Sequence, residues 1–513
     1  MKQRMKPQEK NGKRLRGLLH DIYKNRMIYL LISPFFFIYG IFWIFPIFYS
    51  FFLSFHKWGG VGEKKFVGLF YFQHLLQDST FLLSIKNTLI IWVLSTIPMV
   101  IIAVILAFLL NGAFLKGKNF FRTVYYLPNI TSTVAIAIVF ANIFGNKYGI
   151  LNFLISRLGF DPVQWMSLTW GVHVAIAAIV IWRWTGYNAI ILLAGLQKIS
   201  SSLYEAASLD GASTFQIFRY ITVPLLNPVI QFVVITSTIG GWQLFAEAQM
   251  LVGTAGGIGK SGMTVVLYLY NQAFGNRQFG YGSAISWALV VIIGFCPRLT
   301  GFLPNGRWTD MTVNKAVSKI LLYGFIILGA LISLFPFYWL AVMATNSSAA
   351  FMRFPPVMVF GGQFMTNMTN LLNSIQFGRA MFNTFVVAVC KTVGGVFFCS
   401  LASFYFAKFK FPGRRFLFAL CLVTMMIPPQ LNLIPQLIIM NKFGWLSTFK
   451  ALILPGLIPA FGIYWMNQYC IGSIHDDLIH SARIDGCGTF GLFLHVGLPI
   501  MVPGCAFLCI YRS

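Results

Sequence analysis

Two short polar motifs carry residue types that proteins use to hold a partner. The first reads Glu205-Ala206-Ala207-Ser208-Leu209-Asp210-Gly211-Ala212, and the second reads His480-Ser481-Ala482-Arg483-Ile484-Asp485-Gly486-Cys487. The offset of 275 residues between them also matches one phenylalanine and two prolines in each, namely Phe218, Pro224 and Pro228 with Phe493, Pro499 and Pro503. An ordinary loop would not keep this register, so we predict that both motifs dock on a partner.

The first motif has the pattern of two short helices joined by a sharp turn. We predict a helix over 204–209, with Glu205 in its first turn, where a carboxylate meets the positive end of the helix dipole. Gly211 allows the turn without steric cost, and Ser213 can cap a second short helix that reaches Tyr220. Such a shape suits insertion into a groove on another protein. The alternative is an interfacial amphipathic helix without a partner.

Other polar clusters do not predict catalysis or ligand binding. The run 256–261 resembles a phosphate-binding loop, but Thr254 stands where that motif needs glycine. A flexible outer loop is the better interpretation. A metal cluster could be imagined from His475, Asp476, Asp477 and His480. The two histidines are five apart and off a common helical face, which favours a solvated loop. The sequence therefore predicts no catalytic residue, no metal site, no cofactor and no enzyme activity.

The elements that must position these motifs are membrane helices. The chain has 513 residues, of which 58% are hydrophobic and only 10% charged, whereas ordinary soluble domains carry about 25% charged residues. A segment in lipid must satisfy its own backbone hydrogen bonds, so each long apolar run predicts a helix. The predicted spans are 27–54, 88–110, 124–144, 169–195, 228–250, 282–303, 319–343, 381–406, 416–440 and 448–470, with an incomplete one from 499. The expected fold class is an all-α, polytopic membrane protein.

The net charge is +26, and the positions of the basic residues indicate how the chain is oriented in the membrane. Nine Lys or Arg residues lie in 2–26, ahead of the first span, and basic residues recur in every second loop. Because cytoplasmic loops are enriched in Lys and Arg, we expect a multi-pass protein of the cell membrane with a cytoplasmic N-terminus. Lipid head groups, rather than nucleic acid, are the expected partner of this charge.

The repeat extends beyond the polar motifs and divides the chain. Asn87-Thr88 opens one span and Asn383-Thr384 opens its counterpart. Internal repeats of this kind are common in transporters. We predict a basic cytoplasmic N-terminus over 1–26, a first bundle over 27–303, a cytoplasmic linker over 304–317 and a second bundle over 318–513. The two bundles have parallel orientations. The second is incomplete, because the repeat would continue for roughly 65 residues beyond it.

The first motif, followed by Ile221 and Pro224, resembles the cytoplasmic signature of binding-protein-dependent ABC importer permeases. The run Trp182-Arg183-Trp184-Thr185-Gly186-Tyr187-Asn188 is similar to the first permease subunit of sugar importers, and Phe411-Pro412-Gly413-Arg414-Arg415 to the second. The resemblance implies the type I importer fold, two permease subunits fused in one chain, a separate ABC ATPase dimer, an extracellular solute-binding protein and a sugar substrate. It assigns coupling to the ATPase to Glu205, Ala206, Ala207, Asp210, Gly211, Ala212, Pro224, Asp485, Gly486 and Pro499.

Charged residues inside spans are costly and often functional. Arg183 and Glu247 are candidates to line a pathway, and snorkelling or an internal ion pair is the equally weighted alternative. For Lys391, snorkelling or an internal pair is the favoured interpretation. Aromatic side chains that could stack on sugar rings complete the pathway candidates, namely Trp184, Tyr187 and Trp242.

The expected function is that of a sugar-importer permease coupled to a separate ATPase through two coupling helices. His480 stands where this resemblance leads us to expect glutamate, and the second bundle is incomplete. Both departures leave open a degenerate, transport-incompetent fusion of two permease genes. An ion-coupled secondary transporter is a further alternative, and the scarcity of acidic residues in the spans counts against it. The identity of the sugar and of its pocket residues does not follow from the sequence.

Overall fold

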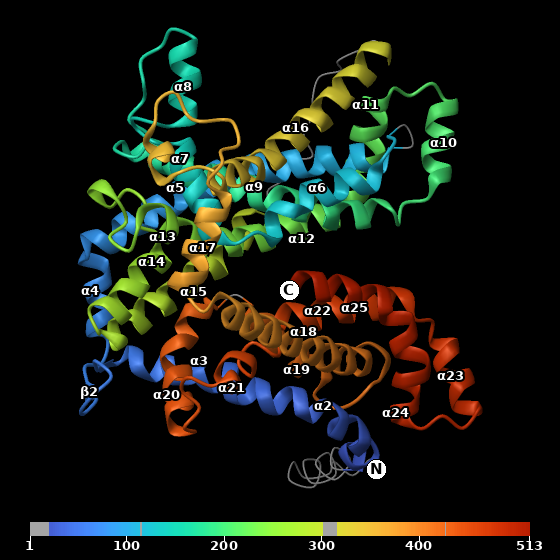
Figure 1. Cartoon of the computed structure of the whole chain (residues 1–513). Coiled ribbons are helices and arrows are strands. Elements are labelled where there is room, and N and C mark those ends of the chain that lie inside the picture. The colour runs from blue at the N-terminus through green and yellow to red at the C-terminus, as the bar shows by residue number, and fades with distance from the viewer. Residues whose placement is uncertain (1–19, 113–114, 301–314, 426, 513) are drawn as a thin grey trace, which may run out of the picture. The chain divides into compact units, whose positions relative to one another are not determined.

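The computed structural model describes residues 20–112, 115–300, 315–425 and 427–512. In these ranges the chain is nearly all helix, with one small sheet in which β1, His56–Lys57, pairs with β2, Lys65–Phe66 (Figure 1). The all-α fold class is therefore confirmed. Among the described residues, seven helices are long and apolar enough to span a membrane, or up to eight if one bent pair counts as a span.

The bent pair replaces the straight span predicted over 124–144. Helix α6, Lys118–Ile130, and helix α7, Thr133–Ile143, meet at 95°. Thr131 and Ser132 between them have extended backbone angles. Pro128 lies in the last turn of α6, and a proline there removes a helical hydrogen-bond donor. The apolar run was read correctly, but its break was not predicted.

Two further predicted spans are wrong as continuous helices. The run 416–440 is divided between α19, Arg414–Thr424, and α20, Leu433–Lys442. The run 448–470 is divided between α21, Phe449–Ile453, and α22, Ala460–Ser473. Both breaks contain prolines, which end helices by removing N–H donors; they are Pro428, Pro429, Pro455 and Pro459.

The predicted fifth, sixth and last spans also change in extent. Helix α15, Phe279–Thr300, begins three residues before the predicted sixth span, and the last residues of that predicted span, 301–303, lie outside the described residues. The run 228–250 belongs to α12, Val223–Trp242, and to a separate helix, α13, Ala246–Val252. The segment treated as incomplete from 499 belongs to a candidate span of 21 residues, Thr489–Cys509, because its helix begins earlier than expected.

The helices group into two compact units that differ from the two halves of the sequence. Unit 1 contains Met1–His56 and Gln376–Ser513, and unit 2 contains Lys57–Ile375. Helix α2, Arg26–Tyr39, therefore packs with the second half, where the Tyr29 hydroxyl donates to the carbonyl of Pro412 at 2.8 Å. Helix α16, Lys315–Ala344, packs with the first half, where the Tyr125 hydroxyl donates to the carbonyl of Ile326 at 2.7 Å.

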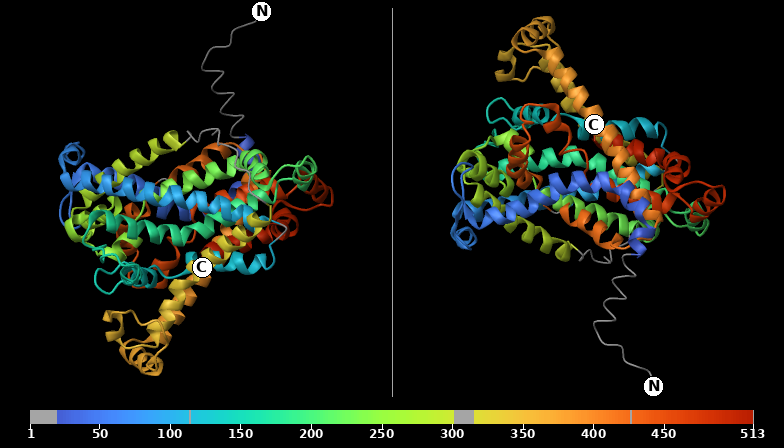
Figure 2. Two further views of the ribbon diagram at one scale, coloured as in Figure 1. Left: turned by 90° about the horizontal axis from the view of Figure 1, so that it is seen from above. Right: turned by 90° about the horizontal axis from the view of Figure 1, so that it is seen from below.

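Each unit has its own apolar core. In unit 2 the long helices α5, Ser79–Asn111, and α9, Thr169–Leu196, lie side by side (Figure 2), and α12 packs against both. In unit 1 the core is formed by α2, α18, Phe377–Lys408, α22 and α25, Leu498–Arg512. It is rich in buried aromatic rings, including Tyr39, Phe404, Tyr405 and Phe493.

Candidate functional site

The first polar motif is a helix that ends in a fixed turn. Helix α10, Ser201–Leu209, is followed by Gly211 at φ +79°. The Ala212 amide donates to the Ala207 carbonyl at 2.9 Å, and the Gly211 amide donates to the Ser208 carbonyl at 3.2 Å. These two bonds define a Schellman motif, which satisfies carbonyls at a helix end and needs a left-handed residue. The sharp turn predicted at Gly211 is present.

The second motif reproduces this turn bond for bond. Helix α23, Asp476–Ile484, is followed by Gly486 at φ +85°. The Cys487 amide donates to the Ala482 carbonyl at 2.9 Å, and the Gly486 amide donates to the Arg483 carbonyl at 3.1 Å. Each bond joins residues 275 positions after those of the first motif. The repeat in sequence is therefore also a repeat in backbone geometry.

The motifs also share an exposed apolar surface that sequence reasoning missed. Leu209 and Ile484, just before the Asp-Gly pairs, are 89% and 86% exposed. Two flanking positions match as closely, with 45% for both Leu203 and Leu478 and 40% for both Phe215 and Phe490. We call these six residues the apolar footprint. Their common offset of 275 was visible in the sequence, but exposure at matched positions needs the fold.

The segment after the turn differs from the prediction of a second short helix ending at Tyr220. Ser213 and Gln216 form a reciprocal capping box, in which the Gln216 amide donates to Ser213 Oγ at 3.2 Å and the Ser213 amide donates to Gln216 Oε1 at 2.7 Å. From there the helix continues without a break through α11, Thr214–Gln216, and a π-helical segment into α12. Pro224 lies within this continuous helix, so the motif leads into the span without an intervening loop.

A shallow cavity of about 360 Å³ lies beside the first turn. Asp210, Gly211 and Ala212 line one side, and Gln216 and Tyr220 line the other. The motif thus offers a protruding apolar residue and an adjoining concave surface that carries a carboxylate.

The second motif has ties to its own unit that distinguish it from the first. Lys408 Nζ lies 2.9 Å from Asp476 Oδ1, and the Arg483 guanidinium lies over the Phe409 ring at 5.0 Å. The hydrogen bond and the charge of Lys408 lower the pKa of Asp476. Within the described residues no group of three or more His, Cys, Asp or Glu is placed to hold a metal ion.

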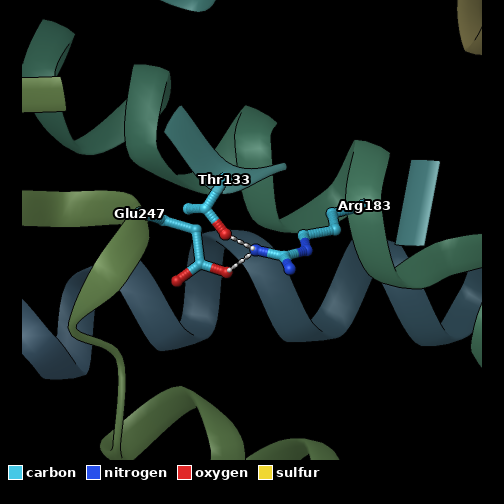
Figure 3. Close-up of polar contacts among 3 residues, drawn as sticks. All are labelled: Thr133, Arg183 and Glu247. Carbon is cyan, nitrogen blue, oxygen red and sulfur yellow. Dashed lines mark hydrogen bonds and ion pairs between the residues drawn. The ribbon is translucent and has the colours of Figure 1, made fainter. Parts of the chain in front are cut away.

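Among the pathway candidates, Arg183 and Glu247 are brought together. Arg183 Nη1 lies 3.1 Å from Glu247 Oε1 and donates to Thr133 Oγ1 at 2.6 Å (Figure 3). The two side chains are 17% and 8% exposed. The contact joins α9 to α13 and to α7 just past the 95° bend. The internal pair that the sequence left open is therefore present, and lining of a pathway stays a prediction.

Of the aromatic candidates, Trp184 contacts the ion pair, because the Arg183 guanidinium lies over its ring at 5.6 Å. The rings of Trp184 and Tyr187 meet edge to face at 5.6 Å on α9. Trp242 is buried, and its indole nitrogen meets no acceptor in the part of the chain that the structure describes. Lys391 lies against Gly456 at the break between α21 and α22.

The glycine-rich run 256–261 is held in place by a buried polar network. Asn87 Nδ2 donates to the carbonyls of Lys260, at 2.9 Å, and Met263, at 3.2 Å. Nε2 of His173 lies 2.9 Å from the Ser261 carbonyl, and Thr88 Oγ1 accepts from the Val265 amide at 3.0 Å. This network gives the repeated Asn-Thr pair a structural role in unit 2, and it anchors a loop that we expected to be flexible.

Asp78 joins the start of α5 to two later helices. Its carboxylate accepts from the amides of Thr80 and Phe81 and from the hydroxyls of Tyr268 and Tyr281. Burial alone would raise the pKa of Asp78, but these hydrogen bonds outweigh it and hold the pKa below the ordinary value of 3.8. The ionised carboxylate therefore stabilises the folded state above this pH.

We expect acid to weaken this connection. Because the folded pKa is depressed, the contribution is complete above 3.8 and is lost as the pH falls through the lower folded pKa. Asp78→Asn should lower the midpoint temperature of unfolding at pH 7, by roughly 2–4 °C for each kcal/mol of unfolding free energy lost. Between pH 7 and pH 3.5, the midpoint of this variant should also fall less than that of wild type. Thermal unfolding of the purified protein at pH 7 and pH 3.5 measures both effects. Asp161→Asn, at an exposed carboxyl, is the control, and equal acid dependence of Asp78→Asn and wild type would contradict the assignment.

Comparison with known proteins identifies the family to which the chain belongs. A model described as "binding-protein-dependent transport system inner membrane component" matches residues 88–303 and 395–513. The arabinooligosaccharide transport permease AraP of Bacillus subtilis is 36% identical over 53% of this chain and 86% of its own length. The lactose transport permease LacF of Rhizobium radiobacter is 36% identical over 54% and 94%, and the trehalose/maltose transport permease MalF of Thermococcus litoralis is 33% identical over 52% and 89%. The chain belongs to the family of binding-protein-dependent ABC transporter permeases, and it carries the family's domain twice.

Proposed function

We propose that this chain forms the translocation pathway of an ATP-driven sugar importer and couples to a separate ATPase dimer through α10 and α23. The observation that carries this proposal is the duplicated docking geometry. Each motif has a Schellman turn and half of the apolar footprint, and the two copies match at a constant offset. Membership of the permease family supports it, as do relatives named for transport of arabinooligosaccharides, lactose and trehalose or maltose.

The geometry suits docking in a groove. An apolar side chain as exposed as Leu209 or Ile484 is costly in water, and its burial contributes about 1.5–3 kcal/mol. Two equal surfaces on one chain suit a dimeric partner with two equal grooves. ATP binding would close the partner's grooves on both helices, and the continuous helical connection to α12 and α25 would pass that movement to the spans.

The remaining partners follow from the same proposal. The enrichment of Lys and Arg in alternate loops supports a cytoplasmic position for α10, α23 and the N-terminus. A solute-binding protein would then deliver sugar to the opposite face, and lipid head groups would neutralise the basic loops. The chain's own residues supply the pathway and the docking surfaces, while the ATPase supplies the energy.

The proposal is tested by co-expressing the full chain with a carbohydrate-type ABC ATPase. We expect the ATPase to co-purify with the chain. Proteoliposomes supplied with a solute-binding protein and labelled maltose, lactose or arabinooligosaccharide should accumulate at least one of these sugars in an ATP-dependent way. Failure to capture the ATPase would overturn the proposal. Capture without uptake would favour the transport-incompetent fusion, and uptake driven by an ion gradient without ATP would favour a secondary transporter.

The apolar footprint gives a sharper prediction. Leu209→Ser and Ile484→Ser should each weaken capture of the ATPase by about tenfold or more, since about 1.4 kcal/mol corresponds to tenfold in affinity. The double variant should lose capture almost completely. Leu158→Ser is the matched control, because Leu158 is 75% exposed and lies outside both motifs. Equal binding of ATPase by the Leu209→Ser, Leu158→Ser and wild-type chains, measured by titration on immobilised permease, would remove the footprint from the interface.

A further inference from the structure

A six-residue π-helix lies near the start of the candidate span that follows each docking motif. The first covers Ile217–Thr222 and the second covers Leu492–Gly497. Both ends of the two segments are 275 residues apart, as are the three-residue helices that precede them, α11 and α24, Thr489–Gly491. π-Helices are rare and occur mostly as single turns, often at functional sites. Their recurrence in the same register of both halves therefore calls for a physical cause.

A proline shortly follows each segment and favours the wider turn. Pro224 and Pro499 have no N–H to donate, and in an α-helix their rings would clash with the carbonyl four residues earlier. A π turn holds one extra residue and displaces that carbonyl. The resulting i→i+5 bonds run from the Val223 amide to the Phe218 carbonyl and from the Leu498 amide to the Phe493 carbonyl. Both prolines are exposed, so they act through the backbone and not through packing.

Each π segment also rests on a neighbouring span through aromatic contacts. The Phe218 ring meets the Phe108 ring of α5 at 4.9 Å. The Phe493 ring meets the Phe404 ring of α18 at 5.8 Å. Phe404 follows Phe108 by the same offset of 296 that relates Asn383 to Asn87. The wide turn is thus supported in each copy by an aromatic ring of the adjacent helix.

The segments on either side are stiffer than the π turn. On the motif side, the Schellman turn and the capping box fix α10 relative to α11. On the other side, α12 continues as a regular helix to Trp242. A bend between motif and span therefore concentrates at the π turn, since sharp changes in helix direction occur at prolines and π-bulges.

We propose that the two π segments are joints at which each docking motif changes its angle to the following span during the transport cycle, with Phe108 and Phe404 as the supports. This inference rests on the proposed function, because the ATPase supplies the movement. The joint lets a docking motif follow the closing ATPase while its span turns against the bundle by a smaller amount. A plain α-helix would transmit the movement as a rigid rod.

The joint is tested first in a chain that keeps Pro224 and Pro499. Two fluorescent unnatural amino acids are placed at Ser201 of α10 and Ile235 of α12, both exposed positions of unit 2. A swing of about 20° at the joint moves the far end of the nine-residue helix α10 by about 5 Å. We expect the label distance in the chain–ATPase complex to differ by about this amount between the nucleotide-free state and the state trapped with a non-hydrolysable ATP analogue. An unchanged distance would overturn the joint.

Restoring the α register provides the second test. Pro224→Ala supplies an N–H that can bond to the Tyr220 carbonyl, so the extra residue is no longer required. We expect the state-dependent distance change to disappear and sugar uptake to fall by about tenfold or more, as for other hinge changes that gate turnover. Pro228→Ala is the matched control, because Pro228 is an exposed proline of the same helix with no π turn before it. Pro499→Ala should act in the same way on the second copy.

The outcomes separate this inference from the proposed function. Uptake and distance change in Pro224→Ala that match Pro228→Ala would overturn the joint alone. A wild-type chain that captures no ATPase would overturn the proposed function, and the joint with it. Normal capture, a distance change in wild type and its loss in Pro224→Ala would support both.

Discussion

Gly211→Val is expected to abolish sugar uptake while membrane insertion is retained. Gly211 has φ +79°, a left-handed conformation that is strained for any β-branched side chain. A Cβ at this position meets no atom within 4 Å, so the effect comes from the backbone and not from a clash. Valine would open the Schellman turn and misdirect Leu209 and Asp210. The same reasoning applies to Gly486→Val in the second motif.

This prediction is checked by ATP-dependent uptake in proteoliposomes, with the amount of inserted protein measured in parallel. Gly240→Val is the matched control, because Gly240 lies within α12, has no positive φ and also has open space around it. We expect uptake by Gly240→Val within about threefold of wild type, in line with the small cost of exposed helix substitutions. Full uptake by Gly211→Val would remove the turn, and the docking role assigned to it, from the mechanism.

Arg183→Met is expected to cause the largest loss of stability. Glu247 is only 8% exposed on its side chain, so removal of its partner leaves a buried carboxylate without compensation. Breaking a buried ion pair in this way typically costs about 3–5 kcal/mol. The α13 segment should detach from α9 and α7, and the unfolding midpoint of the detergent-purified protein should fall.

The double variant Arg183→Met/Glu247→Met separates the pair from its surroundings. Replacement of a buried pair by apolar residues of similar volume is often close to neutral, so most of the lost stability should return. Arg157→Met, which removes an exposed arginine near the Phe153 ring, is the control and should stay close to wild type. A double variant no more stable than Arg183→Met would show that the two side chains do not act as a pair.

The features that the sequence predicted well are those that depend on local chemistry. Gly211 and Gly486 signalled a turn because few other residues adopt a left-handed backbone. Apolar runs signalled helices because a backbone in lipid has few alternatives. Pro128 and Pro428 lie within predicted spans and stand at or beside the breaks that the structure shows there. Composition identifies the apolar run, but the exact point where a helix breaks depends on the contacts that replace its lost hydrogen bonds.

The features that sequence missed depend on residues distant along the chain. Arg183 and Glu247 are 64 positions apart, and only the packing of α13 on α9 brings them into contact. The apolar footprint could be recognised only from the exposure of its side chains in the fold, and the π segments only from the pattern of backbone hydrogen bonds. Local sequence patterns also did not predict the unit to which each helix belongs. The apolar residues of α2 and α16 do not indicate which helices these two pack against.

The position of α2 in unit 1 has a consequence for biosynthesis. Tyr29 and its acceptor at Pro412 are 383 residues apart. At about 5–20 residues per second, translation separates the emergence of these two groups by roughly 20–80 seconds. The first helix must therefore remain in the bilayer, its tyrosine hydroxyl satisfied by water or a lipid head group, until the second half arrives. Nascent chains halted before that point would expose a tyrosine hydroxyl without its protein acceptor, which quality-control proteases can recognise.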